Sequence, residues 1–327
     1  MDSPLRTVAE VFRTHHTFVL TTHVNPDGDA IGSEAALADA LRRDRKSVEI
    51  VNHSPTPEIY DFLDPDRTIR VYQPTRDRAL LEETEVIVVL DANQPDRLRS
   101  MEHDVIHSRA NVVCIDHHLD PHPFARHYLI DDGATSTAEI LFRLITHLYG
   151  TRLSAFTASA LYTAIMTDTG SFRYPRVDAE THRMVANLIE CGADPVGIYS
   201  RVYERWTDGR LQLLGETLSK LKTDSEGKIA YVTITQDMLR RTGTSEEDTD
   251  NFTTYPMSIG GVRAGILFLE LSDGVKISFR SRGEIPINEL AREFGGNGHA
   301  NAAGARMSGA SLEEIEQRVV HAARKYV

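Results

Sequence analysis

The sequence has 327 residues, 41% hydrophobic and 26% charged, which is the composition of an ordinary globular protein. This length exceeds what one hydrophobic core usually organises, so we expect two domains. The formal net charge of -12 argues against binding of long duplex DNA, because such binding needs many Lys and Arg contacts with phosphates. A short anionic ligand is compatible with this charge, since it needs only a local cluster of cations or metal ions.

The cysteine content and the N-terminus indicate the cellular setting. Cys114 and Cys191 are the only cysteines, so neither a disulfide framework nor a thiolate zinc site is expected. Residues 1–10 lack the apolar core of a signal peptide. No apolar run approaches the roughly 20 residues of a membrane span. We therefore expect a cytoplasmic protein that does not associate with membranes.

The first half of the chain alternates strand-like and helix-like segments. Short apolar, β-branched runs predict strands at 17–22, 48–52, 85–90 and 111–115. Helical periodicity predicts helices at 33–45, 137–149, 155–166 and 179–190. Continuous apolar strands between helices are typical of a parallel sheet that helices cover on both faces. We expect an α/β fold with a doubly wound parallel sheet in the N-terminal domain.

The pattern changes near residue 195, where a polar stretch with helical character begins. We place an N-terminal domain at 1–195, a helical linker at 196–225 and a C-terminal domain at 226–327. The last of these is expected to be a smaller α/β domain, because strand-like runs and helix-like runs alternate in it as well.

The C-terminal domain contains a hairpin signal. Strand-like runs at 262–271 and 275–280 flank Ser272-Asp273-Gly274, and both Asp and Gly tolerate positive φ. A helix-like segment follows at 287–294. Further on, Ser311-x-x-Glu314 indicates the N-terminal cap of a last helix.

Chemistry-bearing residues follow the first strand directly. They are His23, Asp27 and Asp29. Ligands of open α/β sheets bind at the carboxyl ends of the strands, so this loop is a candidate site. Gly28 and Gly32 are expected to let the backbone approach a ligand, and Ser33 is expected to cap the next helix. Taken alone, Asp27-Gly28-Asp29 is equally consistent with a turn.

Two more strands end in polar residues of the same kind. Asp91 follows the third strand, and Asp116-His117-His118 follow the fourth. The loops should converge at one edge of the sheet, where a cluster of buried charges needs metal compensation. Asp168 ends an apolar helix and could add a carboxylate, although an acidic residue at a helix end is usual. Oxygen and imidazole ligands suit Mn²⁺, with Mg²⁺ and Co²⁺ as alternatives, better than structural zinc.

These motifs resemble those of the DHH phosphoesterase family. The family name describes Asp116-His117-His118, and the other N-terminal motifs match Asp27-Gly28-Asp29, Asp91 and Asp168 in order. The C-terminal half resembles the DHH-associated domain through the segments 276–281 and 295–304. The compact layout is similar to that of the nanoRNase and phosphoadenosine-phosphate phosphatase branch, which includes dinucleotide phosphodiesterases.

The resemblance implies two divalent metal ions, most simply Mn²⁺. The implied ligands are His23 and Asp27 for one ion, Asp29, His117 and Asp168 for the other, and Asp91 as the bridge between them. Asp116 would orient its neighbours, and His118 would approach the scissile phosphate.

The resemblance also implies substrate contacts in the C-terminal domain, at Arg280, Ser281, Gly296, Gly298 and His299. The chain departs from the family pattern at Asn297, where glycine is usual; asparagine tolerates left-handed backbone better than most residues. The implied substrate is a short oligoribonucleotide or a linear or cyclic dinucleotide, cleaved to 5′-mononucleotides, with 3′-phosphoadenosine 5′-phosphate as a further candidate. A homodimer is compatible with the sequence.

Two other functions are alternatives. The inorganic pyrophosphatase and polyphosphatase branch shares the N-terminal motifs, but its C-terminal domain is expected to differ from the 295–304 segment. A non-catalytic nucleotide sensor has no physical need for two hydrolytic metals, and every position implied as a ligand is present in this chain.

Overall fold

The computed structural model describes residues 4–327, except for the side chain of His299. The chain forms two compact units, the first ending at Arg205 and the second spanning Trp206–Val327. This division falls inside the segment 196–225. Helix α8 (Pro195–Tyr203) buries Ile198 in the core of the first unit, and α9 (Asp208–Ser219) buries Leu213 in the second. Apolar contacts thus attach each of these two helices to its own unit.

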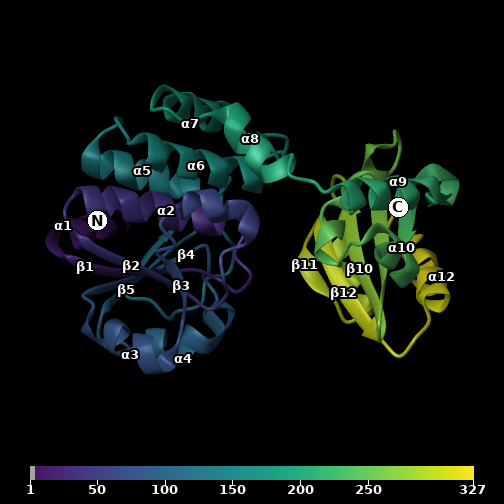
Figure 1. The fold of residues 1–327 in the computed structure, drawn as a ribbon, viewed down its shortest axis with the longest axis horizontal. Coiled ribbons are helices and arrows are strands. Elements are labelled where there is room, and N and C mark those ends of the chain that lie inside the picture. Colours follow the sequence, from purple (N-terminus) through teal and green to yellow (C-terminus); the bar gives the residue numbers. More distant parts are fainter. Residues whose placement is uncertain (1–3) are drawn as a thin grey trace. The chain divides into compact units, whose positions relative to one another are not determined.

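A six-stranded sheet in the order β3-β2-β1-β4-β5-β6 forms the centre of the first unit (Figure 1). Its strands are β1 (Thr17–Thr21), β2 (Ser47–Asn52), β3 (Ile69–Val71), β4 (Val86–Leu90), β5 (Asn111–Asp116) and β6 (His127–Ile130). All neighbouring pairs are parallel, which confirms the predicted doubly wound sheet. The chain runs outward from β1 to β3 and then resumes on the other side of β1 with β4.

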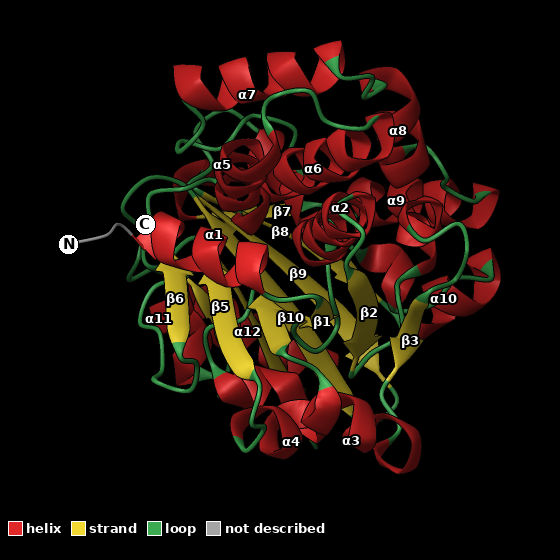
Figure 2. Ribbon diagram, turned by 90° about the vertical axis from the view of Figure 1, so that its left-hand side faces the viewer, coloured by secondary structure: helices red, strands yellow, loops and turns green. Residues whose placement is uncertain are grey.

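Helices cover both faces of this sheet, as Figures 1 and 2 show. One face carries α1 (Pro4–Thr14), α2 (Gly28–Arg43), α5 (Thr137–Tyr149) and α6 (Ala155–Asp168), with α7 (Ala179–Glu190) outside them. The other carries α3 (Pro74–Glu83), α4 (Glu102–Ile106) and the 3-10 segment η2 (Pro95–Met101). The 3-10 segment η1 (Glu58–Leu63) packs with the first group. Successive strand side chains point to opposite faces, so Phe18 and Leu20 join one core and Val19 the other.

Helix α2 begins earlier than predicted. The side chain of Asp27 caps it by accepting from the backbone amides of Asp29 at 3.0 Å and Ala30 at 3.1 Å. The expectation that Ser33 is the cap is therefore wrong, because Ser33 lies inside the helix. A Cβ added at Gly32 would lie 2.6 Å from the Ala160 carbonyl oxygen of α6. This glycine serves the close packing of two helices instead of the approach of a ligand.

The second unit has a mixed sheet in the order β11-β12-β10-β9-β8-β7. Its strands are β7 (Lys222–Asp224), β8 (Ile229–Ile234), β9 (Ala264–Leu271), β10 (Gly274–Ser281), β11 (Asn297–His299) and β12 (Ala302–Ser308). Only the β8–β9 pair among them is parallel. The antiparallel β9–β10 pair confirms the predicted hairpin, and the unit confirms the predicted smaller α/β domain.

The helices of the second unit lie on both faces of its sheet. One hydrophobic core of this unit contains residues of α11 (Ile287–Glu293) and α12 (Leu312–Ala323). Another contains residues of α9 and α10 (Gln236–Thr242). Short 3-10 turns occur at η3 (Ser225–Gly227), η4 (Glu247–Thr249), η5 (Phe252–Thr254) and η6 (Pro256–Ser258). The Ser311 side chain accepts from the amide of Glu314, as the capping pattern predicts. Among the helices described here, none is both long enough and apolar enough to cross a membrane.

Replacing Gly32 by alanine should destabilise the first unit by about 1–3 kcal/mol, because the new methyl group overlaps the α6 backbone. Gly215 of α9 is a matched control, since it is helical and has no atom within 4 Å of an added Cβ. Gly215→Ala should instead stabilise by about 0.5–1 kcal/mol. Urea unfolding measures both values. Equal effects of the two substitutions would contradict the packing role of Gly32.

Candidate metal centre

The candidate site lies at the carboxyl edge of the first sheet, where the strand order reverses beside β1. His23 follows β1, Asp91 follows β4, and Asp116 is the last residue of β5. Two helices contribute as well: Asp29 lies in the first turn of α2, and Asp168 ends α6. The predicted convergence of loops is therefore present at the edge where ligands of open α/β sheets bind.

The side chains form three overlapping groups whose nitrogen and oxygen atoms lie within 4.8 Å of one another. The groups are Asp91, Asp116, His117 and His118; His23, Asp27 and Asp91; and Asp29, His117 and Asp168. Together they contain every residue that the sequence implicated as a ligand or as a neighbour of one.

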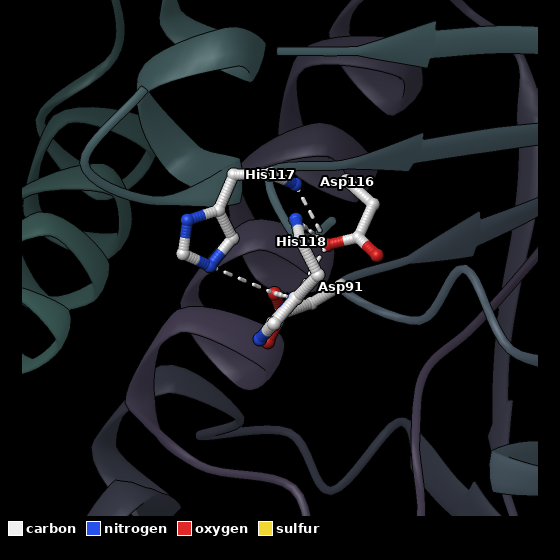
Figure 3. Close-up of side chains that lie close together, drawn as sticks. All are labelled: Asp91, Asp116, His117 and His118. Atoms are coloured by element: carbon white, nitrogen blue, oxygen red, sulfur yellow. Dashed lines mark hydrogen bonds and ion pairs between the residues drawn. The ribbon is translucent and has the colours of Figure 1, made fainter. Parts of the chain in front are cut away.

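Asp91 belongs to two of these groups, and Figure 3 shows its side chain beside those of the DHH residues 116–118. Its Oδ2 is 3.3 Å from His23 Nε2, and its Oδ1 is 3.6 Å from His117 Nε2. On the far side, His117 Nε2 is 3.5 Å from Oδ2 of Asp168. Two ligands placed about 2.1 Å from one ion lie roughly 3–4 Å apart. The spacing of these donor atoms therefore suits the binding of divalent metal ions.

The position of Asp91 is held by backbone and side-chain contacts. Its backbone is left-handed, with φ of 56°, a conformation that few residues other than glycine adopt and that concentrates at functional sites. Its amide donates to the carbonyl of Ile115 at 3.0 Å, and Thr137 Oγ1 donates to its Oδ1 at 2.9 Å. These bonds aim the carboxylate at both histidines.

Asp29 faces the N-terminus of α5. The backbone amides of Thr137 and Ala138 donate to its two carboxylate oxygens at 2.7 Å and 3.0 Å. Amides at a helix N-terminus stabilise a negative charge. Sequence reasoning missed Thr137, which contacts both Asp29 and Asp91. Helical periodicity predicted this helix at 137–149, but nothing in the sequence indicated which carboxylate its amides would face.

Asp116 orients the two histidines that follow it (Figure 3). Its Oδ1 accepts from the backbone amides of His117 at 2.7 Å and His118 at 3.2 Å, and from His118 Nδ1 at 2.8 Å. The carbonyl oxygen of His118 accepts from Asn93 Nδ2 at 2.8 Å. The carboxylate thus stabilises the turn and holds the ring of His118.

Burial shifts the ionisation of the cluster. It raises the pKa of Asp29 to about 7 and that of Asp168 to about 8, and the neighbouring carboxylates add to both effects. Burial and the Asp29 charge raise the pKa of Asp91 well above its ordinary value. Burial and His118 lower the pKa of His117 to about 4, so this imidazole is neutral at neutral pH. Neutral imidazole is the form that binds metal ions.

Asp116 is the exception among the buried carboxylates of the cluster. Burial favours its protonated form, but the hydrogen bond and charge of His118 outweigh this effect and lower the pKa. Its Oδ2 is buried and accepts no hydrogen bond from the described residues. Crowded carboxylates beside neutral imidazoles repel one another unless cations are present. The donor set therefore fits divalent metal ions.

In the second unit, Arg280 and Ser281 occupy the end of β10. Arg280 is half-buried, and its guanidinium donates to the carbonyl of Phe279 at 3.0 Å. The Ser281 hydroxyl donates to the Ile285 carbonyl at 2.7 Å and accepts from Asn301 Nδ2 at 2.9 Å. Ser281 thereby connects the end of the strand to the turn before β12.

The glycine-rich segment has a packing reason for its composition. A Cβ at Gly298, where φ is 151°, would lie 2.5 Å from the carbonyl oxygen of Ala302, and one at Gly296 would overlap the Gly304 carbonyl. Asn297 does not have the left-handed backbone considered for it, because it lies in β11, and its Oδ1 accepts from the amide of Gly298 at 2.8 Å. The side chain of His299 lies outside the described part of the structure.

Two family models match the chain. The model described as DHH family, N-terminal domain, matches residues 17–165, and the DHHA1 domain matches residues 206–327. These matches confirm the resemblance that the motifs indicated in both halves of the sequence.

Two curated relatives match almost end to end. A Thermus thermophilus protein named bifunctional oligoribonuclease and PAP phosphatase NrnA is 30% identical over 98% of this chain and 94% of its own length. A Bacillus subtilis protein of the same name is 30% identical over 90% of this chain and 92% of its own.

Solved structures share the fold. An exopolyphosphatase-related protein from Bacteroides fragilis superimposes with a TM-score of 0.93 at 30% identity, over 98% of this chain and 96% of that one. RecJ from Thermus thermophilus in complex with Mn²⁺ gives a TM-score of 0.59 at 16% identity, over 98% of this chain and 55% of that one.

The free energy of unfolding of chelator-treated protein should fall as the pH rises from about 4 to about 8. Asp29 and Asp168 have folded-state pKa values of about 7 and about 8 against 3.8 for ordinary aspartic acid, so the folded state binds more protons in this window. The stabilisation is complete below the unfolded pKa and is lost as the pH rises through the folded pKa. Urea unfolding at several pH values measures it.

The substitution Asp168→Asn removes one ionisable carboxyl group from the cluster and so measures its contribution to the pH dependence. The difference in stability between this variant and the unsubstituted chain should change across the same pH window, in favour of the variant at the higher pH. A difference that stays constant with pH would mean that Asp168 ionises normally in the folded protein.

Proposed function

The chain belongs to the DHH family of phosphoesterases, and we propose that it hydrolyses short oligoribonucleotides or dinucleotides, linear or cyclic, to 5′-mononucleotides at the cluster around Asp91. The observation that carries the proposal is the placement of Asp91 between two histidine and carboxylate groups. Two relatives that match nearly the whole chain are named as oligoribonuclease and PAP phosphatase, so 3′-phosphoadenosine 5′-phosphate is a further candidate substrate.

The family is metal-dependent, and the three donor groups suit two divalent ions. His23 and Asp27 would hold one ion, Asp29, His117 and Asp168 the other, and Asp91 both. Two such ions would supply an activated water as nucleophile and neutralise charge on the phosphate. We favour Mn²⁺ over Mg²⁺ and Co²⁺, since the ligands combine oxygen and imidazole nitrogen.

The chain's own residues would orient the substrate and move a proton. A carboxylate can only accept, so the hydrogen bond from His118 to Asp116 requires a proton on Nδ1 of the ring. A proton could then pass between His118 and the substrate only at the other ring nitrogen, Nε2. With both ring nitrogens protonated, His118 would donate from Nε2 to a phosphate oxygen or to the leaving oxygen.

The second unit would bind the rest of the substrate. Arg280 is the strongest candidate for a phosphate contact, because a guanidinium donates two parallel hydrogen bonds. Ser281 ends β10 beside Arg280, and Gly296, Gly298 and His299 lie in or next to β11, so these residues are further candidates for substrate contacts. These contacts would set the preference for short substrates. The homodimer stays a prediction.

The pyrophosphatase and polyphosphatase alternative has less support, because the DHHA1 model matches the whole second unit. The name of the Bacteroides neighbour nevertheless makes polyphosphate a necessary comparison substrate. Purified protein with Mn²⁺ should be tested against linear dinucleotides, longer oligoribonucleotides, cyclic dinucleotides, 3′-phosphoadenosine 5′-phosphate, pyrophosphate and polyphosphate. Turnover of only the last two would overturn the proposal.

Asp91→Asn and His117→Ala should each reduce kcat on a dinucleotide by at least about 10³-fold, because each removes a proposed metal ligand that belongs to two of the three groups. Circular dichroism should stay unchanged. His107→Ala, at an exposed histidine of the same unit, should leave activity intact. Near-full activity of Asp91→Asn would refute its role between the two ions, and hydrolysis that survives a chelator would refute the metal requirement.

Arg280→Ala should reduce kcat/KM on a dinucleotide by roughly 10-fold to 100-fold, the equivalent of one charge-assisted hydrogen bond. A small activated phosphodiester that lacks the second nucleotide should be hydrolysed almost as before. Lys276 is a matched control on the same strand and face, where its ammonium pairs with Glu246 at 3.0 Å. Lys276→Ala should leave both activities unchanged. Equal losses of Arg280→Ala on the two substrates would contradict a substrate-binding role.

A further inference from the structure

A buried polar network lies beside the metal centre without belonging to it. Asn52 ends β2 and is fully buried. Its Oδ1 accepts from the amide of Thr22 at 3.1 Å, and its Nδ2 donates to Glu34 Oε2 at 2.9 Å. Asn52 therefore connects the end of β1 to the middle of α2.

Glu34 is the second member of the network. It is fully buried in α2, and burial raises its pKa to about 8. Its Oε1 has no hydrogen-bond partner among the described residues. A buried oxygen without a partner costs about 1–3 kcal/mol, so an apolar side chain would serve packing alone better. The presence of a carboxyl group at this buried position points to a role other than stability.

Thr22 is the third member. It is fully buried, and its hydroxyl donates to the carbonyl oxygen of Leu90 at 2.7 Å. Thr22 directly precedes His23, and Leu90 directly precedes Asp91. One side chain therefore links the two strand ends that deliver the first histidine and the central carboxylate of the cluster.

We propose that Glu34, Asn52 and Thr22 are positioning residues, which set the spacing of His23, Asp91 and Asp29 by joining the ends of β1, β2 and β4 to α2. The inference rests on the proposed metal centre. Such supporting hydrogen bonds hold ligands in place, and their loss typically reduces metal affinity or activity by about 10-fold to 100-fold.

The chain contains a matched control for Thr22. The hydroxyl of Thr84, also buried, donates to the carbonyl of Thr17 at 3.1 Å. This bond ties the start of β1 to the segment that enters β4, at the opposite end of the same two strands. Thr22→Val and Thr84→Val therefore remove the same kind of bond between the same strands, beside the cluster in the first case and far from it in the second.

The experiment measures Mn²⁺ binding to the full chain by calorimetry, the free energy of unfolding of chelator-treated protein, and kcat and KM on a dinucleotide. Thr22→Val should weaken Mn²⁺ binding by about 10-fold or more and lower kcat with little change in KM, whereas Thr84→Val should affect stability only. Asn52→Leu should resemble Thr22→Val.

Two substitutions of Glu34 test whether a side chain that still accepts from Asn52 preserves Mn²⁺ binding. Glu34→Gln keeps an oxygen that accepts from Asn52 and should retain Mn²⁺ affinity within about threefold, whereas Glu34→Leu should lose about 10-fold to 100-fold. If Thr22→Val and Thr84→Val weaken Mn²⁺ binding equally, or if neither weakens it, the positioning role is wrong. If the unsubstituted chain itself binds no Mn²⁺, the proposed function fails first, so the two failures are distinguishable.

Discussion

The burial of several crowded carboxylates at the carboxyl edge of the first sheet is the constraint on which the rest of the structure depends. Asp29, Asp91 and Asp168 are held close enough that burial and their neighbours raise the pKa of each. Each of these three side chains also lies within ion-pair distance of a histidine. Such a cluster stores electrostatic energy that divalent cations would release, which is a usual property of a binding site.

Several local features keep the carboxylates together. The α5 amides stabilise the charge of Asp29, and the left-handed backbone of Asp91 directs it between the histidines. Gly32 lets α2 lie against α6, and these helices deliver Asp29 and Asp168. Helix packing thereby determines how far apart two of the proposed ligands lie. The stability of the fold and the geometry of the site are therefore linked through the same contacts.

The sequence predicted the parallel sheet and the convergence of the loops, because buried parallel strands are continuously apolar and their carboxyl ends meet at one edge. It did not predict β3 and β6, which are short edge strands with partly exposed residues. It placed the start of α2 too late, since Asp27 was considered as a ligand and not as a helix cap. The same residue is implicated in both roles.

Contacts between distant segments escaped prediction for a different reason. Thr137 contacts Asp29 and Asp91 across a separation of 108 and 46 residues, and no local pattern encodes such a contact. The bond between Asn52 and Glu34 is of the same kind. Asn297 needs no tolerance of left-handed backbone, because this position is part of a strand and not of a left-handed turn.

Anomalous diffraction from crystals grown with Mn²⁺ tests the two-ion centre most directly. We expect two peaks at the carboxyl edge of the first sheet, roughly 3.5–4 Å apart, with the Asp91 carboxylate between them. One peak should adjoin His23 and Asp27, and the other Asp29, His117 and Asp168. A single peak, or two peaks that do not share Asp91, would contradict the proposed centre.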